Sequence, residues 1–218
     1  MIGAVIAMQS EADILLDLMD INSTLTVSGK TVYVGKAFGK DVALCVCGVG
    51  KVNAALGTQL LVSKFGADKI LNFGVAGALN SDMEIAGVYQ IGAAVQFDFD
   101  LVQLNGTKIG TLNEYTENYL YLNLLSAPFP IKKLGTADRF NDSKEDFILL
   151  TKELNADIRD MEGGAIVQAA FAATLPVYSI KAISDLAGSG STTEQYLVNK
   201  DKALQELQKA LPIIFEQL

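Results

Sequence analysis

Three acidic residues stand where they could do chemistry, because each one follows a short apolar run. Glu11 lies in Ser10-Glu11-Ala12-Asp13, Glu162 in Asp160-Met161-Glu162-Gly163-Gly164, and Asp185 in the pair Ser184-Asp185. The chain contains no histidine, which removes Ser-His-Asp and Cys-His nucleophile schemes and histidine as a general base. If the protein is an enzyme, carboxylates are therefore expected to carry its proton chemistry.

Each acidic residue also has a purely structural explanation. Glu11 could complement the dipole in the first turn of a helix, and Ser184-Asp185 could form a turn before the loop 188–191. Glu162 fits such an explanation less well. Gly163 and Gly164 follow it, and each weakens a helix by roughly 1 kcal/mol relative to alanine. Two glycines at a helix start instead indicate room for a ligand or a close contact between helix and strand.

An α/β arrangement must position these residues, since short apolar runs alternate with helical patterns along the chain. Residues 97–130 show no clear pattern, and Pro212 marks a kink in the last predicted helix. The pattern predicts a single domain over residues 1–218, a three-layer α/β/α fold with a mixed, mostly parallel central sheet. The predicted strands cover 2–7, 31–38, 42–47, 69–73, 87–96, 131–136, 158–161 and 177–183, and the predicted helices 10–20, 51–65, 143–154, 162–174 and 193–217.

Ligands of such sheets bind outside the carboxyl ends of the strands. Four polar segments fall there, and we expect them to form one site: 8–11, 74–77, 160–162 and 184–185. The glycines of Gly74-Val75-Ala76-Gly77 read as a turn that ends a strand and lets a ligand approach the backbone. This segment is not a phosphate-binding P-loop, because the Gly-Lys-Ser/Thr ending is missing. Phe140, near another strand end, could be a core residue or could stack on a base.

Composition narrows the class of protein further. Half of the 218 residues are hydrophobic and the net charge is −8, so a large core is expected and nucleic acid is not expected as a partner. No basic run suggests an anionic membrane surface, and no apolar run approaches the ~20 residues that a membrane helix needs. The N-terminus reads as a first strand and not as a signal peptide. Cys45 and Cys47 are expected to be buried, reduced thiols, which suits a cytoplasmic protein.

The polar segments and their order resemble one known family. The matching stretches are IGAVIAMQSE (2–11), GVGKVNAALG (48–57), NFGVAGAL (72–79), 138–140, DMEGGA (160–165) and AISD (182–185). Together they resemble the 5′-methylthioadenosine/S-adenosylhomocysteine nucleosidases, within the wider nucleoside phosphorylase family. The resemblance implies a nucleoside phosphorylase-like fold and a purine nucleosidase that hydrolyses the N-glycosidic bond of adenine nucleosides, releasing adenine and the thioribose product.

The resemblance also implies roles for individual residues. Glu11 is expected to activate the attacking water, and Glu162 to hold the ribose hydroxyls. Asp185, oriented by Ser184, is expected to give a proton or a strong hydrogen bond to purine N7. The remaining substrate-binding residues are expected to be Phe140, which would stack on adenine, Asn141 through its backbone, Met161 against the sugar, and Met8, Val75, Ala76, Gly77 and Asp160.

This chemistry requires neither a metal nor a cofactor. A phosphorylase usually holds phosphate with arginines, and the chain has only Arg139 and Arg159, so hydrolysis is favoured. The resemblance further implies a homodimer in which the partner completes the 5′ pocket, with exposed apolar residues of 97–130 as a candidate interface. Alternatives remain open: a nucleoside phosphorylase, a futalosine-type hydrolase, or a purine-binding relative without catalysis.

Several positions depart from the family pattern and bear on the 5′ substituent. Val75 stands where serine is frequent, and Lys181 replaces a common arginine. The segment 97–101 lacks the usual histidine, and the loop 188–193 lacks a clear match to the aromatic residue that covers the 5′ group, although Tyr196 is near.

Overall fold

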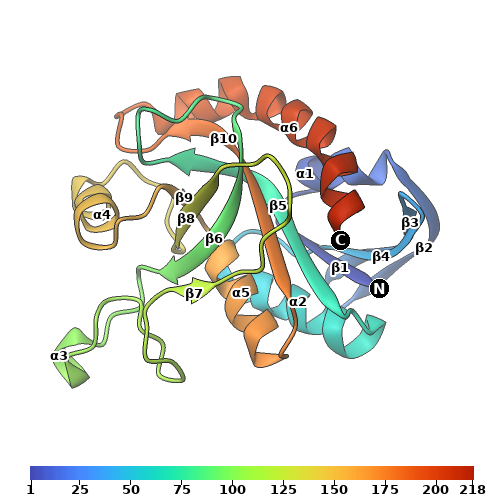
Figure 1. Cartoon of the computed structure of the whole chain (residues 1–218), viewed down its shortest axis with the longest axis horizontal. Helices are drawn as coiled ribbons and strands as arrows, with labels where there is room; N and C mark the ends of the chain where they lie inside the picture. The colour runs from blue at the N-terminus through green and yellow to red at the C-terminus, as the bar shows by residue number, and fades with distance from the viewer.

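One ten-stranded β-sheet runs through the computed structural model, which describes residues 1–218 (Figure 1). The strands are β1 (Ile2–Ile6), β2 (Met19–Val27), β3 (Lys30–Ala37), β4 (Lys40–Val46), β5 (Lys69–Ala78), β6 (Val88–Gln96), β7 (Leu120–Tyr121), β8 (Ile131–Thr136), β9 (Ile158–Asp160) and β10 (Val177–Leu186). The helices are α1 (Gln9–Leu16), α2 (Lys51–Phe65), α3 (Val102–Asn105), α4 (Lys144–Ile148) with a π-helical continuation at Leu149–Glu153, α5 (Gly163–Ala172) and α6 (Thr192–Gln217).

The sheet is mixed, as predicted, and it is also partly closed. Its order is β10-β6-β8-β9-β5-β1-β4-β3-β2, and β10 pairs back onto β5, so that five strands form a ring. Five strand pairings are parallel and five antiparallel, a more even balance than the predicted, mostly parallel sheet. The closure was not predicted, because it joins strands that are far apart in the sequence.

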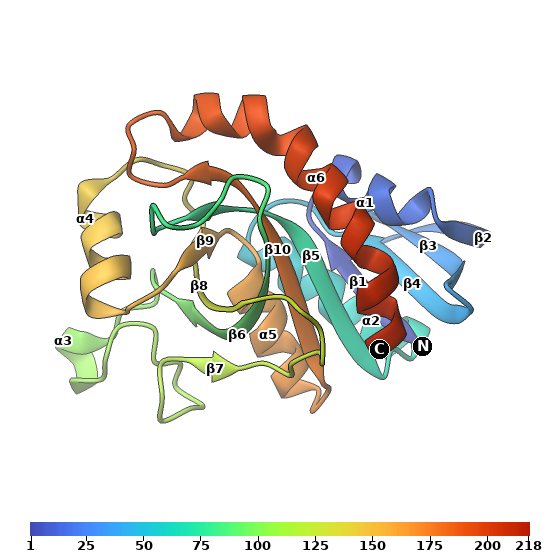
Figure 2. The ribbon, with the colours of Figure 1, turned by 45° about the horizontal axis from the view of Figure 1, so that its top comes forward.

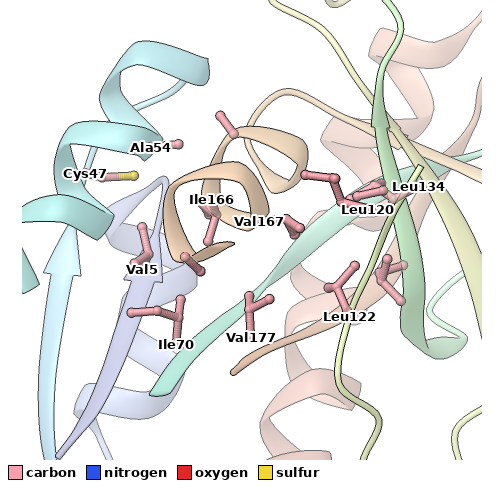
Figure 3. Close-up of a cluster of buried hydrophobic side chains, with 14 of the residues drawn as sticks. Val5, Cys47, Ala54, Ile70, Leu120, Leu122, Leu134, Ile166, Val167 and Val177 are labelled. Carbon is pink, nitrogen blue, oxygen red and sulfur yellow. The ribbon is translucent and has the colours of Figure 1, made fainter. Parts of the chain in front are cut away.

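Helices cover both faces of the sheet, which confirms the three-layer arrangement (Figure 2). One hydrophobic cluster combines α2 and α5 with the sheet, and it includes Ala54, Leu61, Ile166 and Val167. Figure 3 shows these two helices converging on Val5, Ile70 and Val177 of the central strands. A second cluster packs α1 and α6 on the opposite face through residues such as Leu15, Leu207 and Phe215.

Two strands are longer than predicted, and both corrections matter for the site. The segment Gly74–Gly77 was expected to be a turn, but it lies inside β5. Ser184 and Asp185 were expected to follow their strand, but they lie inside β10 at an irregularity of its register with β5. The predicted end of β5 was too early because a glycine is usually read as the end of a strand, and that of β10 was too early because a Ser-Asp pair is usually read as a turn.

The N-terminal helix also differs from its prediction. The expected cap was Ser10, with a helix running to about residue 20. Instead Met8 is the N-cap, Glu11 accepts a hydrogen bond from the Met8 N–H, and the helix ends at Leu16. The chain then enters β2, a strand that was not predicted. Its residues are mostly exposed, so no buried pattern reveals it.

The remaining expectations concern single residues and segments. Pro212 lies within α6, and residues 97–130 hold only α3 and β7. Cys45 and Cys47 are free and buried, as predicted. Burial raises the pKa of Cys45 to about 11 and that of Cys47 to about 12. None of the helices combines the length and apolar character that a membrane crossing requires.

Candidate active site

A cavity of about 330 Å³ opens at the carboxyl ends of β1, β5 and β10, a volume within the range of small-ligand sites. The predicted site residues meet there although they come from distant parts of the chain. Those that line the cavity are Met8, Glu11, Val75, Ala76, Gly77, Phe140, Asp160, Met161, Glu162, Ser184 and Asp185. Asn141 is the one predicted residue that does not line it.

Glu11 is held firmly against β5. Its side chain is 3% exposed, Oε1 accepts a hydrogen bond from the Val75 N–H at 2.9 Å, and Oε2 accepts one from the Met8 N–H at 3.2 Å. Burial raises the pKa of Glu11 above its ordinary value, while Lys181 and the two N–H donors oppose that rise. A carboxylate in such a position is a better base near neutral pH than an exposed one.

The glycines of β5 make room for the carboxylates. A Cβ atom at Gly74 would lie 2.5 Å from Oε1 of Glu11, and a Cβ atom at Gly77 would lie 2.7 Å from Oδ1 of Asp185. Both distances are shorter than van der Waals contact, so a side chain at either position would displace a carboxylate. These glycines therefore serve close approach, although by a different backbone conformation from the predicted turn.

Glu162 occupies the N-cap position of α5 without a capping hydrogen bond from its side chain, and its Oε1 instead accepts a hydrogen bond from the Gly50 N–H at 2.8 Å. Burial, with the nearby negative charge of Asp160, raises the pKa of Glu162 to about 7. The two following glycines are tightly packed: a Cβ atom at Gly163 would lie 2.4 Å from Leu134 Cδ2, and one at Gly164 would lie 3.0 Å from Thr136 Cβ. Close helix–strand contact is thus the structural reason for both glycines.

A buried ion pair underlies this end of the cavity. Lys181 Nζ lies 2.9 Å from Asp160 Oδ2, and both side chains are 3% exposed. Asp160 also accepts hydrogen bonds from the Thr136 hydroxyl at 2.6 Å and the Gly163 N–H at 2.9 Å. Burial alone would lower the pKa of Lys181, but attraction from Asp160, Glu162 and Glu11 raises it. Lys181 thus stays charged and offsets part of the carboxylate charge.

Asp185 marks the other end of the cavity. It is 2% exposed, and the Ser184 hydroxyl donates a hydrogen bond to its Oδ2 at 2.7 Å. Burial raises the pKa of Asp185, while Ser184 and Arg159 act in the opposite direction. An acid with a raised pKa can hold a proton closer to neutral pH and pass it to a ligand.

Aromatic side chains form the more open wall. Phe140 is 48% exposed, and its ring lies edge-on to that of Tyr196, with centroids 5.9 Å apart. The Tyr196 hydroxyl contacts the Met8 sulfur at 3.6 Å, which ties α6 to the end of β1. The exposed ring of Phe140 offers a flat apolar surface, as stacking on a base requires.

Asn141 was predicted to contact adenine through its backbone, and that contact stays a prediction, while its side chain is engaged elsewhere. Its Nδ2 donates to Asp146 at 3.1 Å, and its Oδ1 accepts from the Ser143 N–H at 3.3 Å. The side chain therefore builds the turn before α4, and the residue is not part of the cavity wall.

Sequence reasoning missed three contributors. Lys181 was noted only as a departure from a pattern, Arg159 only as one of two arginines, and Tyr196 only as a nearby aromatic. A charged residue inside an apolar strand run, as in Ile180-Lys181-Ala182-Ile183, was a usable signal, because lysine is almost never buried unless it is paired. Nothing local distinguished Arg159, whose burial depends on strand pairing.

Buried carboxylates at opposite ends of one cavity, beside an exposed aromatic ring, define an enzyme-like site for a small molecule that gains and loses protons. The family is then identified by comparison: the chain belongs to the Phosphorylase superfamily, whose profile matches residues 1–217.

Particular relatives sharpen this assignment. A 5′-methylthioadenosine/S-adenosylhomocysteine nucleosidase from Hydrogenovibrio crunogenus is 32% identical over 213 residues, covering 90% of each chain. A Borrelia burgdorferi protein solved with bound adenine is 26% identical over the full length of both chains, with a TM-score of 0.90. The futalosine hydrolase of Helicobacter pylori shares the fold, with a TM-score of 0.91 and 23% identity over 100% of this chain and 97% of that one.

Proposed function

We propose that this protein is a hydrolase that cleaves the N-glycosidic bond of adenine nucleosides, with 5′-methylthioadenosine and S-adenosylhomocysteine as substrates. The observation that carries the proposal is the meeting of three carboxylates around one cavity: the buried Glu11 and Asp185 and the half-buried Glu162. The names of the curated relatives point the same way.

The roles follow from how charge develops in this reaction. Cleavage of the bond builds positive charge on the sugar and negative charge on the departing base. Glu11 takes a proton from the attacking water. The carboxylate of Glu162 accepts hydrogen bonds from the ribose hydroxyls, and Met161 lies against the sugar. Asp185, held by Ser184, gives a proton to N7 of the base while Phe140 stacks on its face. Paired carboxylates serve glycoside hydrolysis by the same logic.

Water is the proposed nucleophile, because two of the three cations near the site are already paired with carboxylates. Lys181 is paired with Asp160, and Arg139 is paired with Asp146 at 2.7 Å. Arg159 lies at the Asp185 end, where the base is expected. A phosphate dianion would need several free cationic donors close to the sugar.

A homodimer in the cytoplasm remains part of the proposal. Exposed apolar side chains support an interface near the cavity mouth and in residues 97–130, where Leu104 and Tyr121 are 78% and 68% exposed. Two free, buried cysteines are compatible with a reducing compartment. Light scattering on the purified protein at micromolar concentration measures the oligomeric state directly, and a monomer would contradict the dimer.

The decisive experiment is a nucleoside panel, each member assayed with and without phosphate. We expect free adenine from 5′-methylthioadenosine and S-adenosylhomocysteine at rates that phosphate does not change. Release of adenine from neither compound would overturn the proposal. A strict phosphate requirement with ribose 1-phosphate as product would identify a phosphorylase. Turnover of futalosine alone would identify a futalosine-type hydrolase. Adenine binding without turnover would identify a purine-binding protein.

A further inference from the structure

A basic and an acidic side chain flank Gly77. In the sheet register Gly77 pairs with Arg159 of β9 on one side and with Asp185 of β10 on the other. A Cβ atom at Gly77 would lie 3.4 Å from Cγ of Arg159 and 2.7 Å from Oδ1 of Asp185. Both residues line the cavity, and they lie on either side of a position that has no side chain of its own.

Arg159 is a buried cation whose hydrogen bonding is incomplete. The residue is 6% exposed, and its Nη2 has no hydrogen-bond partner. Its Nη1 reaches only Asn141 Oδ1, at 3.5 Å, the outer limit of a hydrogen bond. A guanidinium carries five N–H donors, and a buried charge is costly unless it is compensated. The charge of Arg159 is therefore available to a nearby group that becomes negative.

Three carboxylates interact electrostatically with Arg159: Asp185, Asp146 and Asp142. Asp146 is already bound by Arg139 at 2.7 Å and by Asn141 at 3.1 Å. Asp142 accepts hydrogen bonds from the hydroxyl and the N–H of Thr192. Asp185 receives only the Ser184 hydroxyl. Asp185 is thus the carboxyl group that Arg159 is free to compensate.

We propose that Arg159 is a positioning residue for Asp185, which compensates the negative charge that Asp185 acquires when it passes its proton to the departing base. This inference rests on the proposed function. In the step, the C1′–N9 bond breaks and its electron pair goes to the base, while the Asp185 proton moves to N7. The water that forms the new bond to C1′ gives its proton to Glu11. Asp185 ends as a carboxylate, and the guanidinium of Arg159 interacts electrostatically with it.

The surroundings of Asp185 set the direction of the expected effect. The ionisable groups that face it are Arg159 from β9, Asp142 from the segment before α4 and Tyr196 from α6. Burial raises the pKa of Asp185, and Ser184 and Arg159 lower it. Removal of the guanidinium therefore raises the pKa of Asp185 further. The acid then keeps its proton to higher pH but releases it less readily.

The test compares Arg159→Met with Arg159→Lys, which keeps the charge. With 5′-methylthioadenosine as substrate, we expect Arg159→Met to lower kcat at least tenfold, to change KM less than about threefold, and to move the alkaline limb of the kcat profile to higher pH. Arg159→Lys should keep the limb near its original position and restore most of kcat. A loss of activity with an unmoved limb indicates a merely structural role and overturns the inference.

A second measurement does not depend on turnover. Carboxyl-carbon NMR, with Asp185 assigned through Asp185→Asn, follows its titration in the unliganded protein. We expect Asp185 to titrate at higher pH in Arg159→Met than in the wild type, and equal midpoints overturn the inference even if the enzyme is active. If the wild type cleaves no nucleoside, the proposed function fails while this titration still decides the coupling.

Two controls complete the design. Arg139→Met removes the other arginine of the cavity, which is already paired with Asp146, and should leave the Asp185 midpoint in place. Thermal unfolding establishes that each variant is folded. If Arg159→Met does not fold, Arg159→Gln replaces it in both measurements. A shift of the alkaline limb and of the Asp185 midpoint to higher pH then supports the inference, and unchanged values overturn it.

Discussion

Oε1 of Glu11 occupies the space in which a side chain at Gly74 would begin, since a Cβ atom there would lie only 2.5 Å from that oxygen. The residues are far apart in the sequence, yet the Val75 N–H next to Gly74 donates to the same oxygen at 2.9 Å. In β5, Gly74 therefore leaves room for Glu11, the proposed base, and the Val75 N–H orients its carboxylate.

Gly74→Ala is expected to displace Glu11 and to lower kcat by about 100-fold, the usual cost of moving a reacting group by an ångström. Adenine affinity should change little, because the Asp185 end is untouched. Gly77→Ala is the matched variant: its methyl group displaces Asp185, and adenine affinity should fall. Steady-state kinetics and adenine titrations separate the two effects. Normal kcat in Gly74→Ala would contradict the role of Glu11.

Asp185→Asn should reduce kcat by about 10²–10⁴-fold, because asparagine cannot give a proton to the leaving base. The measurement is adenine release at saturating substrate, with circular dichroism and thermal unfolding to show that the fold is intact. Ser184→Ala removes only the hydrogen bond that orients Asp185 and should cost less. Near-normal turnover by Asp185→Asn removes this residue from the mechanism.

Glu162→Gln is expected to make the protein more stable at pH 8 but not at pH 4. The pKa of Glu162 is raised to about 7 by burial and Asp160, above its value in an unfolded chain. Its contribution to stability is therefore present at low pH and lost as pH rises through 7. Urea unfolding should show a gain on the order of 1–3 kcal/mol at pH 8, and a destabilised variant at that pH would contradict the burial argument.

The same Glu162→Gln variant tests the ribose contact. We expect nucleoside affinity of the wild type to fall as pH drops below 7, because protonation removes the acceptor of the ribose hydroxyls. The variant should bind nucleosides more weakly at pH 8 and lose this pH dependence, while free adenine, which has no ribose, binds as before. Calorimetry at pH 6 and 8 measures both ligands, and an unchanged nucleoside affinity would refute the assignment.

Lys181→Met should destabilise the protein by about 3–5 kcal/mol, since it leaves Asp160 as an uncompensated buried charge. The double variant Lys181→Met with Asp160→Asn removes both charges and should recover part of that loss. Lys36→Met, which breaks an exposed ion pair with Asp41, is a matched control expected to cost about 1 kcal/mol or less. Equal losses for the two lysines in urea unfolding would show that burial is unimportant.

Local sequence determined most of the elements, though not β2, α3 or β7, and the chemistry they carry. The helix 51–65 and the strand 131–136 have the predicted bounds. Patterns of apolar residues act over a few positions, and Gly50 and Gly66 flank the helix while Pro130 precedes the strand. The absence of histidine and the placement of Glu11, Glu162 and Asp185 near strand ends restricted the chemistry to carboxylates before any contact was known.

The tertiary structure alone decided which residues touch. The Lys181–Asp160 pair, the approach of Glu11 to Gly74 and the neighbourhood of Arg159 and Asp185 depend on strand order and register. The same is true of the ring formed when β10 returns to β5. A periodic pattern indicates which face of a strand is buried, but it does not specify which other strand pairs with it. Long-range packing supplies that information, and with it the geometry on which the proposed reaction depends.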